Sequence, residues 1–280
     1  MTTQKTTPSP DEIRDAWDRI AEGFDRLATP LTMDMGEEAI RRVGLRPDMT
    51  FLDVAAGSGA LSIPAARLGA RVVATDLAPG MIARLEARAR DEGLSNLEAR
   101  VMDGCALDLE DDSFDVSGSL NGVSLFPDLD RGLEEMVRVT RPGGRVMIAA
   151  FGPMSEVEFL TFFLSAMRAT VPDFEGPPMD PPPPPFQVAE PAELHRRLAG
   201  AGLEDIRVET VAWEMTFRSG RHLWDMVTSS NPIGAAIVAK LTDVQRETVR
   251  DVLDGMLRER AGGASAAILT NGVNVGVGTA

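Results

Sequence analysis

Three aspartates follow apolar segments in the first half of the chain, and each stands where a strand is expected to end. Asp53 lies in the segment FLDVA and is followed by AGSG, a glycine turn over residues 56–59. Glycine lets backbone N–H groups approach a ligand closely, and the N-terminus of a helix after such a turn favours negative charge. Because Asp53 is itself an acid, it would repel a diphosphate and would suit a ligand with an ammonium group.

Asp76 and Asp103 end the next two apolar segments, VVATD and VMD. In a nucleotide-binding fold, a carboxylate at the end of the second strand accepts hydrogen bonds from ribose hydroxyls. A carboxylate at the end of the third strand can accept a hydrogen bond from an exocyclic amine. The three acids therefore indicate a site for a nucleoside that also carries a cationic or hydrogen-donating group.

Short apolar strands alternate with amphipathic helices around these acids. This alternation is typical of an α/β fold with a doubly wound, mostly parallel, Rossmann-like sheet. We expect strands at 50–55, 70–76, 97–103, 114–120 and 145–151, and helices at 60–69, 79–93 and 128–140. The segment RPGG (141–144) is expected to be a turn before the last of these strands.

The first residues, 1–10, are polar with two prolines and are expected to be a disordered tail before two N-terminal helices over 11–46. Asp11 would cap the first of these helices, and Met35 to Val43 would form the second, which ends at Gly44. Residues at spacings of three and four form one apolar face of the first helix. These residues are Ile13, Trp17, Ile20, Phe24 and Leu27.

The regular alternation ends after the expected core, 47–151. We expect a proline-rich cap insertion over 152–190, core elements over 191–217, a helical cap over 218–262 and a final strand within 263–280. Within these segments, a helix is expected at 156–169 and the last two strands at 203–217 and 272–279. The stiff stretch GPPMDPPPPPF (176–186) fits either a surface loop or the rim of a substrate pocket.

Composition excludes several classes of function. The chain has 280 residues and a formal net charge of −15 at pH 7, which argues against a nucleic-acid partner. A single cysteine, Cys105, cannot form an internal disulfide or a cysteine-rich metal site, so no metal is expected. No apolar run approaches the roughly 18 residues of a transmembrane span, and the first residues lack the apolar stretch expected of a signal peptide. We therefore expect a cytoplasmic protein that does not span a membrane.

The segments FLDVAAGSG, VVATD, VMDG, DDSFDV and RVTRPGGRV occur in this order. Together they resemble the motif set of class I S-adenosyl-L-methionine-dependent methyltransferases, over about residues 15–150. The resemblance is greatest to the type-11 and ubiquinone/menaquinone C-methyltransferase branch. It implies a seven-stranded sheet whose last strand is antiparallel, with S-adenosyl-L-methionine as cofactor and S-adenosyl-L-homocysteine as product.

The resemblance also assigns roles to individual residues. The glycine-rich loop holds the methionine part of the cofactor, the acids bind ribose and the adenine amine, and apolar residues cover the adenine. Two N-terminal aromatic residues belong to a segment that often closes over the cofactor. The matching residues are Trp17, Phe24, Asp53, Ala55, Gly57, Gly59, Asp76, Leu77, Met81, Asp103, Gly104, Cys105, Ser119 and Leu120.

This chain departs from the family pattern at two of these positions. Ala55 stands where the family usually has its first glycine, and Phe24 stands where a tyrosine is common. We expect cofactor binding to survive the first change, and the second removes a hydroxyl contact. Quinone-specific signatures are not evident, so the resemblance does not carry a quinone substrate.

Methyl transfer from a sulfonium is an in-line displacement, which requires mainly placement and exclusion of water. An acceptor with a high pKa would also need a base, for which His222 is the candidate catalytic residue. Methionines in the cap segments suit an apolar or aromatic small-molecule acceptor. Any homodimer would use the apolar helices within 156–169 or 223–240.

Two other functions stay open. A methyltransferase-like scaffold, cyclase or regulator would bind the same cofactor without methyl transfer. A nicotinamide-dependent oxidoreductase has a related sheet, but the GxGxxG pattern is absent because Ser62 stands at its third glycine position.

Overall fold

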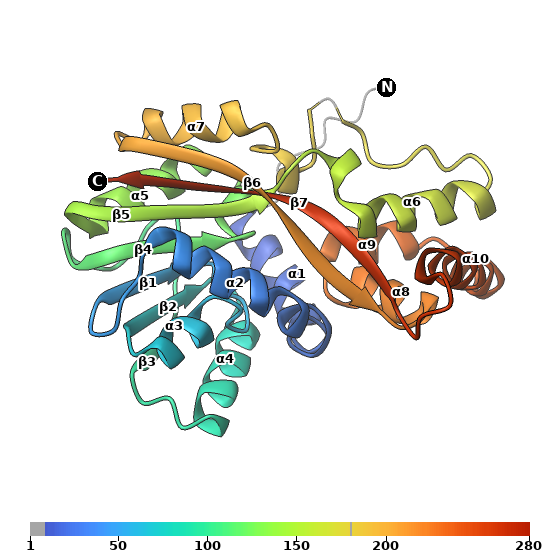
Figure 1. Cartoon of the computed structure of the whole chain (residues 1–280), viewed down its shortest axis with the longest axis horizontal. Coiled ribbons are helices and arrows are strands. Elements are labelled where there is room, and N and C mark those ends of the chain that lie inside the picture. Colours follow the sequence, from blue (N-terminus) through green and yellow to red (C-terminus); the bar gives the residue numbers. More distant parts are fainter. Residues whose placement is uncertain (1–8, 180) are drawn as a thin grey trace.

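Two apolar clusters sandwich a single sheet in the computed structural model, which describes residues 9–179 and 181–280 (Figure 1). The strands are β1 Thr50–Val54, β2 Arg71–Asp76, β3 Leu97–Val101, β4 Phe114–Leu120, β5 Thr140–Phe151, β6 Glu204–Phe217 and β7 Ala267–Thr279. They lie in the order β3-β2-β1-β4-β5-β7-β6. Only β7 runs antiparallel to its neighbours, so the expected seven-stranded, doubly wound sheet is confirmed.

Alternation of side chains along the central strands explains the two clusters, because successive residues of a strand point to opposite faces. Phe51 and Met147 pack on one face with residues of α2 (Thr29–Val43). Leu52 and Ile148 pack on the other face with residues of α5 (Leu129–Val139) and α7 (Pro191–Gly200). Both faces of the sheet are thus buried, as parallel sheets require.

The remaining helices lie along the chain as follows. They are α1 Pro10–Gly23, the π-helix η1 Phe24–Ala28, α3 Ser62–Leu68, α4 Pro79–Asp91, α6 Glu158–Thr170, α8 Gly220–Ser229, α9 Pro232–Val238 and α10 Asp243–Ala261, with short 3-10 turns at Val123–Leu125 (η2), Met154–Glu156 (η3) and Pro184–Phe186 (η4).

The N-terminal expectation needs three corrections. Residues 1–8 of the expected tail lie outside the described residues, but Pro10 already belongs to α1. Ser9, not Asp11, caps that helix, because Ser9 and Glu12 satisfy each other's backbone N–H groups in a capping box. The second helix begins at Thr29 rather than Met35, since the π-helix leads directly into it.

Three strand boundaries also differ from expectation. RPGG lies inside β5 as an irregularity beside β4, not as a turn before it. The strand expected at 97–103 ends at Val101, so Asp103 stands two residues beyond it. The final strand begins at Ala267 rather than Gly272, because its pairing with β6 continues to Phe217.

The long strands β6 and β7 extend beyond the carboxyl end of β5 and carry α8, α9 and α10, while α6 follows β5 (Figure 1). Two buried asparagines of β7 attach the insertion between β5 and α7. The Asn274 side-chain N–H donates to the Ala189 carbonyl at 2.6 Å, and Asn271 Oδ1 accepts from the Phe159 N–H at 3.2 Å. The end of the proline-rich segment is therefore fixed against the sheet.

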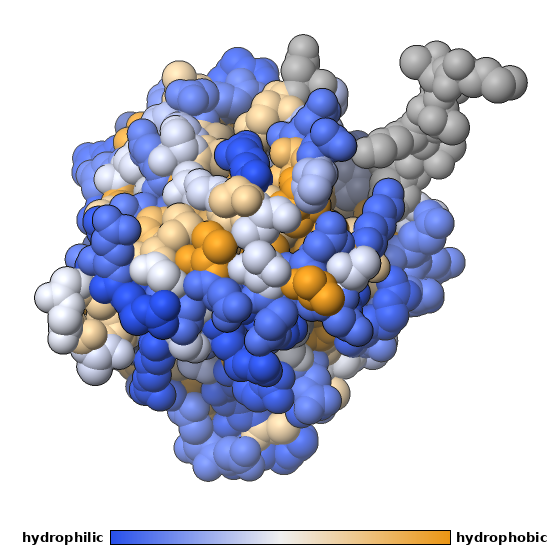
Figure 2. Space-filling view, turned by 90° about the vertical axis from the view of Figure 1, so that its right-hand side faces the viewer, coloured by the Kyte–Doolittle hydropathy of each residue, from blue (hydrophilic) through white to orange (hydrophobic). Residues whose placement is uncertain are grey.

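Figure 2 shows the face formed at this end of the molecule, which is mainly hydrophilic with apolar atoms gathered near its middle. Exposed apolar side chains of these elements include Ile233, Val244 and Ile268. No helix in the described part of the chain is both long enough and apolar enough to cross a membrane.

Two glycine positions give a test of this packing. A β-carbon at Gly36 of α2 would lie 2.1 Å from the Ala60 carbonyl oxygen, whereas one at Gly255 of α10 would meet nothing within 4 Å. Gly36→Ala should therefore lower the free energy of unfolding by about 1–3 kcal/mol through overpacking. Gly255→Ala should raise it by about 0.5–1 kcal/mol, because alanine favours a helix interior. Urea unfolding measures both, and an unchanged or raised free energy of unfolding in Gly36→Ala would contradict the packing of α2 against Ala60.

Candidate functional site

Asp53 is a buried acid at the carboxyl end of β1, with only 1% of its surface exposed. The Ser62 hydroxyl, at the start of α3, donates to Asp53 Oδ2 at 2.5 Å. Asp53 Oδ1 is also buried, yet it has no hydrogen-bond partner among the described residues. Buried polar atoms are normally paired, so this oxygen indicates a place where a ligand donates.

Burial raises the pKa of Asp53 to about 7, because water no longer stabilises the charged form. The hydrogen bond from Ser62 opposes this rise, and the nearby charge of Asp76 adds to it. A cation beside Asp53 would favour the ionised form. The electrostatics thus suit a ligand that brings a positive charge.

The turn after Asp53 has left-handed backbone at three positions. Gly57 has φ 54° and Gly59 has φ 102°, and a β-carbon at Gly59 would lie 2.4 Å from Leu85 Cδ1 of α4. Ala55 has φ 56°, a conformation in which its β-carbon is strained. The chain therefore keeps the backbone shape for which the family uses glycine, at some cost in strain.

Asp76 lies beside the same turn at the end of β2. Its Oδ2 accepts from the Gly57 N–H and its Oδ1 from the Ala78 N–H, both at 2.9 Å. Burial raises the pKa of Asp76, while these backbone N–H groups hold it down. Each carboxylate oxygen can accept a second hydrogen bond, so Asp76 retains capacity for a ribose hydroxyl. Leu77 follows it directly, in the turn before α4.

Asp103, Gly104 and Cys105 form a tight turn after β3. The Cys105 N–H donates to Asp103 Oδ1 at 2.9 Å, and a β-carbon at Gly104 would lie 2.4 Å from the Phe126 ring. Burial, with the charges of Asp103 and Asp128, raises the pKa of the Cys105 thiol to about 11. This thiol stays protonated at neutral pH and is not a nucleophile.

The end of β4 completes the mouth of the sheet. Ser119 is fully buried, donates to the Val54 carbonyl at 2.7 Å and accepts from the Val123 N–H at 2.9 Å. It therefore joins β1 to the turn after β4, with half-buried Leu120 beside it. Sequence reasoning missed the next residue, Asn121, which has φ 52° and a buried Oδ1 without a partner among the described residues.

Trp17, Phe24 and Met81 come together over the glycine turn. They belong to one apolar cluster, in which the Trp17 and Phe24 rings meet edge to face with centroids 6.0 Å apart. A β-carbon at Gly57 would lie 2.9 Å from the Phe24 ring. Asp18 fixes this arrangement, since its carboxylate accepts from the Gly80 N–H of α4 at 2.6 Å. The N-terminal helix thus covers the turn.

His222 does not join this group. It lies in the first turn of α8, beyond the end of β6, with its ring 5.3 Å from that of Phe217. Burial, and then the charge of Arg218, lower its pKa. Its recorded side-chain hydrogen bond is from the Arg218 N–H at 3.5 Å. Among the described residues, no hydrogen bond or ion pair joins the His222 side chain to Asp53, Asp76 or Asp103.

Four aromatic side chains gather where β5 ends, and no periodic pattern predicts this cluster because its members come from four separate elements. The Phe151 ring lies 5.7 Å from Phe159, 6.4 Å from Phe186 and 6.2 Å from Trp213. The Trp213 indole N–H donates to the Leu31 carbonyl of α2 at 3.2 Å. We call this cluster, at the carboxyl end of β5, the aromatic wall.

One hollow in the structure lies apart from the glycine turn and its acids. This hollow of about 450 Å³ at the far end of the cap is lined by residues that include Phe217, Arg218 and Asp254, and by none from the glycine turn. Within residues 9–179 and 181–280, no group of three or more His, Cys, Asp or Glu side chains is placed to hold a metal ion.

Comparison with known proteins gives the family. A family model described as a methyltransferase domain (Methyltransf_11) matches residues 52–148. A demethylmenaquinone methyltransferase of Streptomyces avermitilis is 31% identical over 176 residues, which cover 61% of this chain and 74% of that relative. An uncharacterised protein of Mycobacterium tuberculosis is 39% identical over 125 residues. That match spans 45% of each chain, a little under half of the relative's length.

Two solved structures share the fold. The cyclase SpnF has a TM-score of 0.60 at 14% identity, covering 98% of this chain and 97% of its own. Phosphoethanolamine N-methyltransferase 2 of Haemonchus contortus, solved with S-adenosyl-L-methionine, has a TM-score of 0.58 at 18% identity, covering 98% of this chain and 60% of its own. With the sequence matches and the seven-stranded sheet, this chain belongs to the class I S-adenosyl-L-methionine-dependent methyltransferase family, in its type-11 branch.

Proposed function

We propose that this protein transfers the methyl group of S-adenosyl-L-methionine to a small apolar or aromatic acceptor. The observation that carries the proposal is the buried, unpartnered Oδ1 of Asp53 beside the glycine turn. An ammonium group would pair this oxygen and neutralise the carboxylate at once.

The order of the acids fits the parts of that molecule. Because β3, β2 and β1 are neighbours in the sheet, Asp103, Asp76 and Asp53 follow one another along its carboxyl edge. Adenine amine, ribose and methionine follow one another in the same way along S-adenosyl-L-methionine. Each acid would then accept from the donor that lies opposite it.

The cofactor supplies a methyl group on a positively charged sulfur, already activated for transfer. A lone pair of the acceptor forms the new bond to the methyl carbon, and the carbon–sulfur bond breaks with its electrons left on a neutral thioether sulfur. An N–H or O–H acceptor also loses its proton to a base or to water. The residues of this chain contribute placement, which can lower a barrier by roughly 7–11 kcal/mol.

Two groups of apolar side chains would exclude water from the site of methyl transfer. Trp17, Phe24 and Met81 cover the glycine turn from the N-terminal side. The aromatic wall of Phe151 and its neighbours covers the acceptor side, and its rings favour a flat or greasy molecule. Asn121, at the end of β4 between these groups, is the polar side chain that we assign to the acceptor.

A cofactor-binding protein without methyl transfer is the main alternative, and a cyclase shares the fold. Calorimetric titration with S-adenosyl-L-homocysteine, beside one with NADH, tests the site first. Micromolar binding of the first ligand alone supports the proposal. Formation of S-adenosyl-L-homocysteine in proportion to methylated product then separates a transferase from a scaffold.

Asp76→Ala should weaken S-adenosyl-L-homocysteine binding more than about tenfold, since a hydrogen bond to a charged group is lost. Calorimetry measures the affinity, and thermal unfolding checks that the variant folds. Asp91→Ala, at an exposed position of α4, is the matched control and should bind normally. Unchanged affinity in folded Asp76→Ala would contradict the placement of the ribose.

The raised pKa of Asp53 predicts a pH dependence of stability. Between its ordinary value of 3.8 and its value of about 7 in the folded protein, the folded state holds a proton that the unfolded state has lost. Asp53 therefore lowers the free energy of unfolding as the pH rises from about 4 to about 7. Denaturant unfolding across this range should show a shallower fall in Asp53→Asn than in the natural chain. Identical pH profiles would mean that Asp53 is ionised throughout.

Because no contact among the described residues joins the His222 side chain to the acids, His222→Ala should leave turnover close to that of the natural enzyme once an acceptor is known. His195→Ala, at an exposed position of α7, is the control. A folded His222→Ala protein that binds cofactor but fails to turn over would restore the role of His222 as the base.

A further inference from the structure

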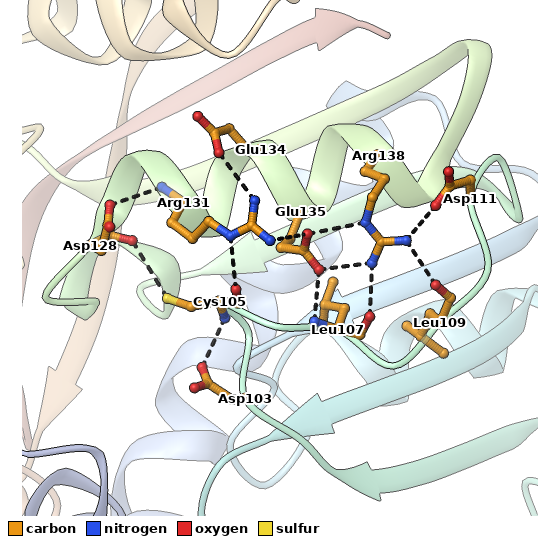
Figure 3. Close-up of polar contacts among 10 residues, drawn as sticks. All are labelled: Asp103, Cys105, Leu107, Leu109, Asp111, Asp128, Arg131, Glu134, Glu135 and Arg138. Atoms are coloured by element: carbon orange, nitrogen blue, oxygen red, sulfur yellow. Dashed lines mark hydrogen bonds and ion pairs between the residues drawn. The ribbon is translucent and has the colours of Figure 1, made fainter.

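The segment that carries Asp103 has little regular structure of its own. Between the end of β3 at Val101 and the start of β4 at Phe114 it contains no helix or strand. Its shape depends on side chains that reach it from α5 (Figure 3). We call residues 103–111 the acidic loop.

Glu135 of α5 is the centre of these contacts and is 3% exposed. Its Oε2 accepts from the Leu107 N–H at 2.8 Å and from Arg138 at 2.8 Å. Its Oε1 accepts from Arg131 at 2.9 Å and from Arg138 at 3.1 Å. One buried carboxylate thus holds both arginines and one backbone amide of the acidic loop.

The two arginines extend this hold along the loop. Arg138 donates to the Leu107 carbonyl at 2.8 Å and to the Leu109 carbonyl at 2.9 Å. Arg131 donates to the Cys105 carbonyl at 3.2 Å. Since the Cys105 N–H holds the Asp103 carboxylate at 2.9 Å, the chain of contacts runs from Glu135 to Asp103 (Figure 3).

Burial distinguishes this network from ordinary surface ion pairs. An exposed ion pair contributes little to stability, whereas removing the partner of a buried carboxylate such as Glu135 leaves an uncompensated charge. The neighbour Glu134 illustrates the contrast, because its side chain is 58% exposed and its one ion pair among the described residues is with Arg131, at 3.3 Å. The buried Glu135 carboxylate thus anchors a chain of contacts that ends at Asp103, although the Arg131 and Arg138 side chains are 50% and 32% exposed.

We infer that Glu135, acting through Arg131 and the Cys105 backbone, is a positioning residue that makes the cofactor site selective for a base with an exocyclic amine. The inference rests on the proposed function. It adds to that function a source of base selectivity on α5, outside the residues that would touch the cofactor. Asp103 accepts from the amine, and Glu135 holds Asp103 in the direction that acceptance requires.

The test compares two ligands that differ at one group. S-adenosyl-L-homocysteine presents an amine on its base, and S-inosyl-L-homocysteine presents a carbonyl oxygen there. The natural chain should bind the first at least about tenfold more tightly, because the second would place two acceptors together. Glu135→Gln should reduce this ratio to about threefold or less, and Glu134→Gln should leave it unchanged.

The ratio separates positioning from a general structural role. If Glu135→Gln weakens both ligands equally, Glu135 only stabilises the fold and the inference fails. If Glu135→Gln does not fold, Arg131→Gln supplies the same readout, since the Glu135–Arg138 pair remains in place. An unchanged ratio in Arg131→Gln overturns the inference.

Failure of the proposed function would look different. A natural chain that binds neither ligand would overturn the cofactor site itself and, with it, the inference. A natural chain that binds both ligands equally would leave the cofactor site intact and overturn only the role of Asp103 and Glu135.

Discussion

The burial of one carboxylate constrains the whole carboxyl edge of the sheet. Asp53 is withdrawn from bulk solvent, so its charged form needs a donor in its surroundings, and otherwise the carboxyl keeps a proton. Ser62 supplies one donor from α3, and the left-handed turn between them brings α3 close enough to do so. The same left-handed turn explains the backbone strain at Ala55 and the use of glycine at Gly57 and Gly59. Among the described residues, Asp53 thus has a hydrogen-bond partner at Oδ2 and none at Oδ1.

Different elements hold the acids in place and cover the site around Asp53. The parallel strands and α5 fix the acids through backbone and buried ionic contacts. The N-terminal helix contributes an apolar cover over the turn, anchored at Gly80 by Asp18. The end of β5 contributes aromatic rings toward the cap. Methyl transfer needs both, because correct placement is useful only where water is excluded.

Much of the core could be predicted from sequence because its signals are local. Asp53, Asp76 and the glycines lie in short segments whose strand and turn character is visible in their own residues. The way in which aromatic side chains meet in the cap could not be predicted from such local signals. Phe151 and Trp213 meet only because β7 pairs between β5 and β6, a long-range fact with no local signal. His222 was proposed on residue type alone, because its own segment carries no signal that places it relative to the acids. Asn121 could have been noticed in the sequence as the first polar residue after the fourth strand. Its left-handed backbone has no signal in the sequence.

The pKa of Asp53 near 7 has a thermodynamic consequence for ligand binding. At neutral pH the free site is a mixture of protonated and ionised molecules. A cationic ligand that favours the ionised form displaces the proton, so one positive charge leaves the buried site as another enters. The net charge of the interior then changes little on binding, and the released proton is taken up by the buffer. The heat of binding therefore includes the buffer's own heat of protonation and differs from one buffer to the next.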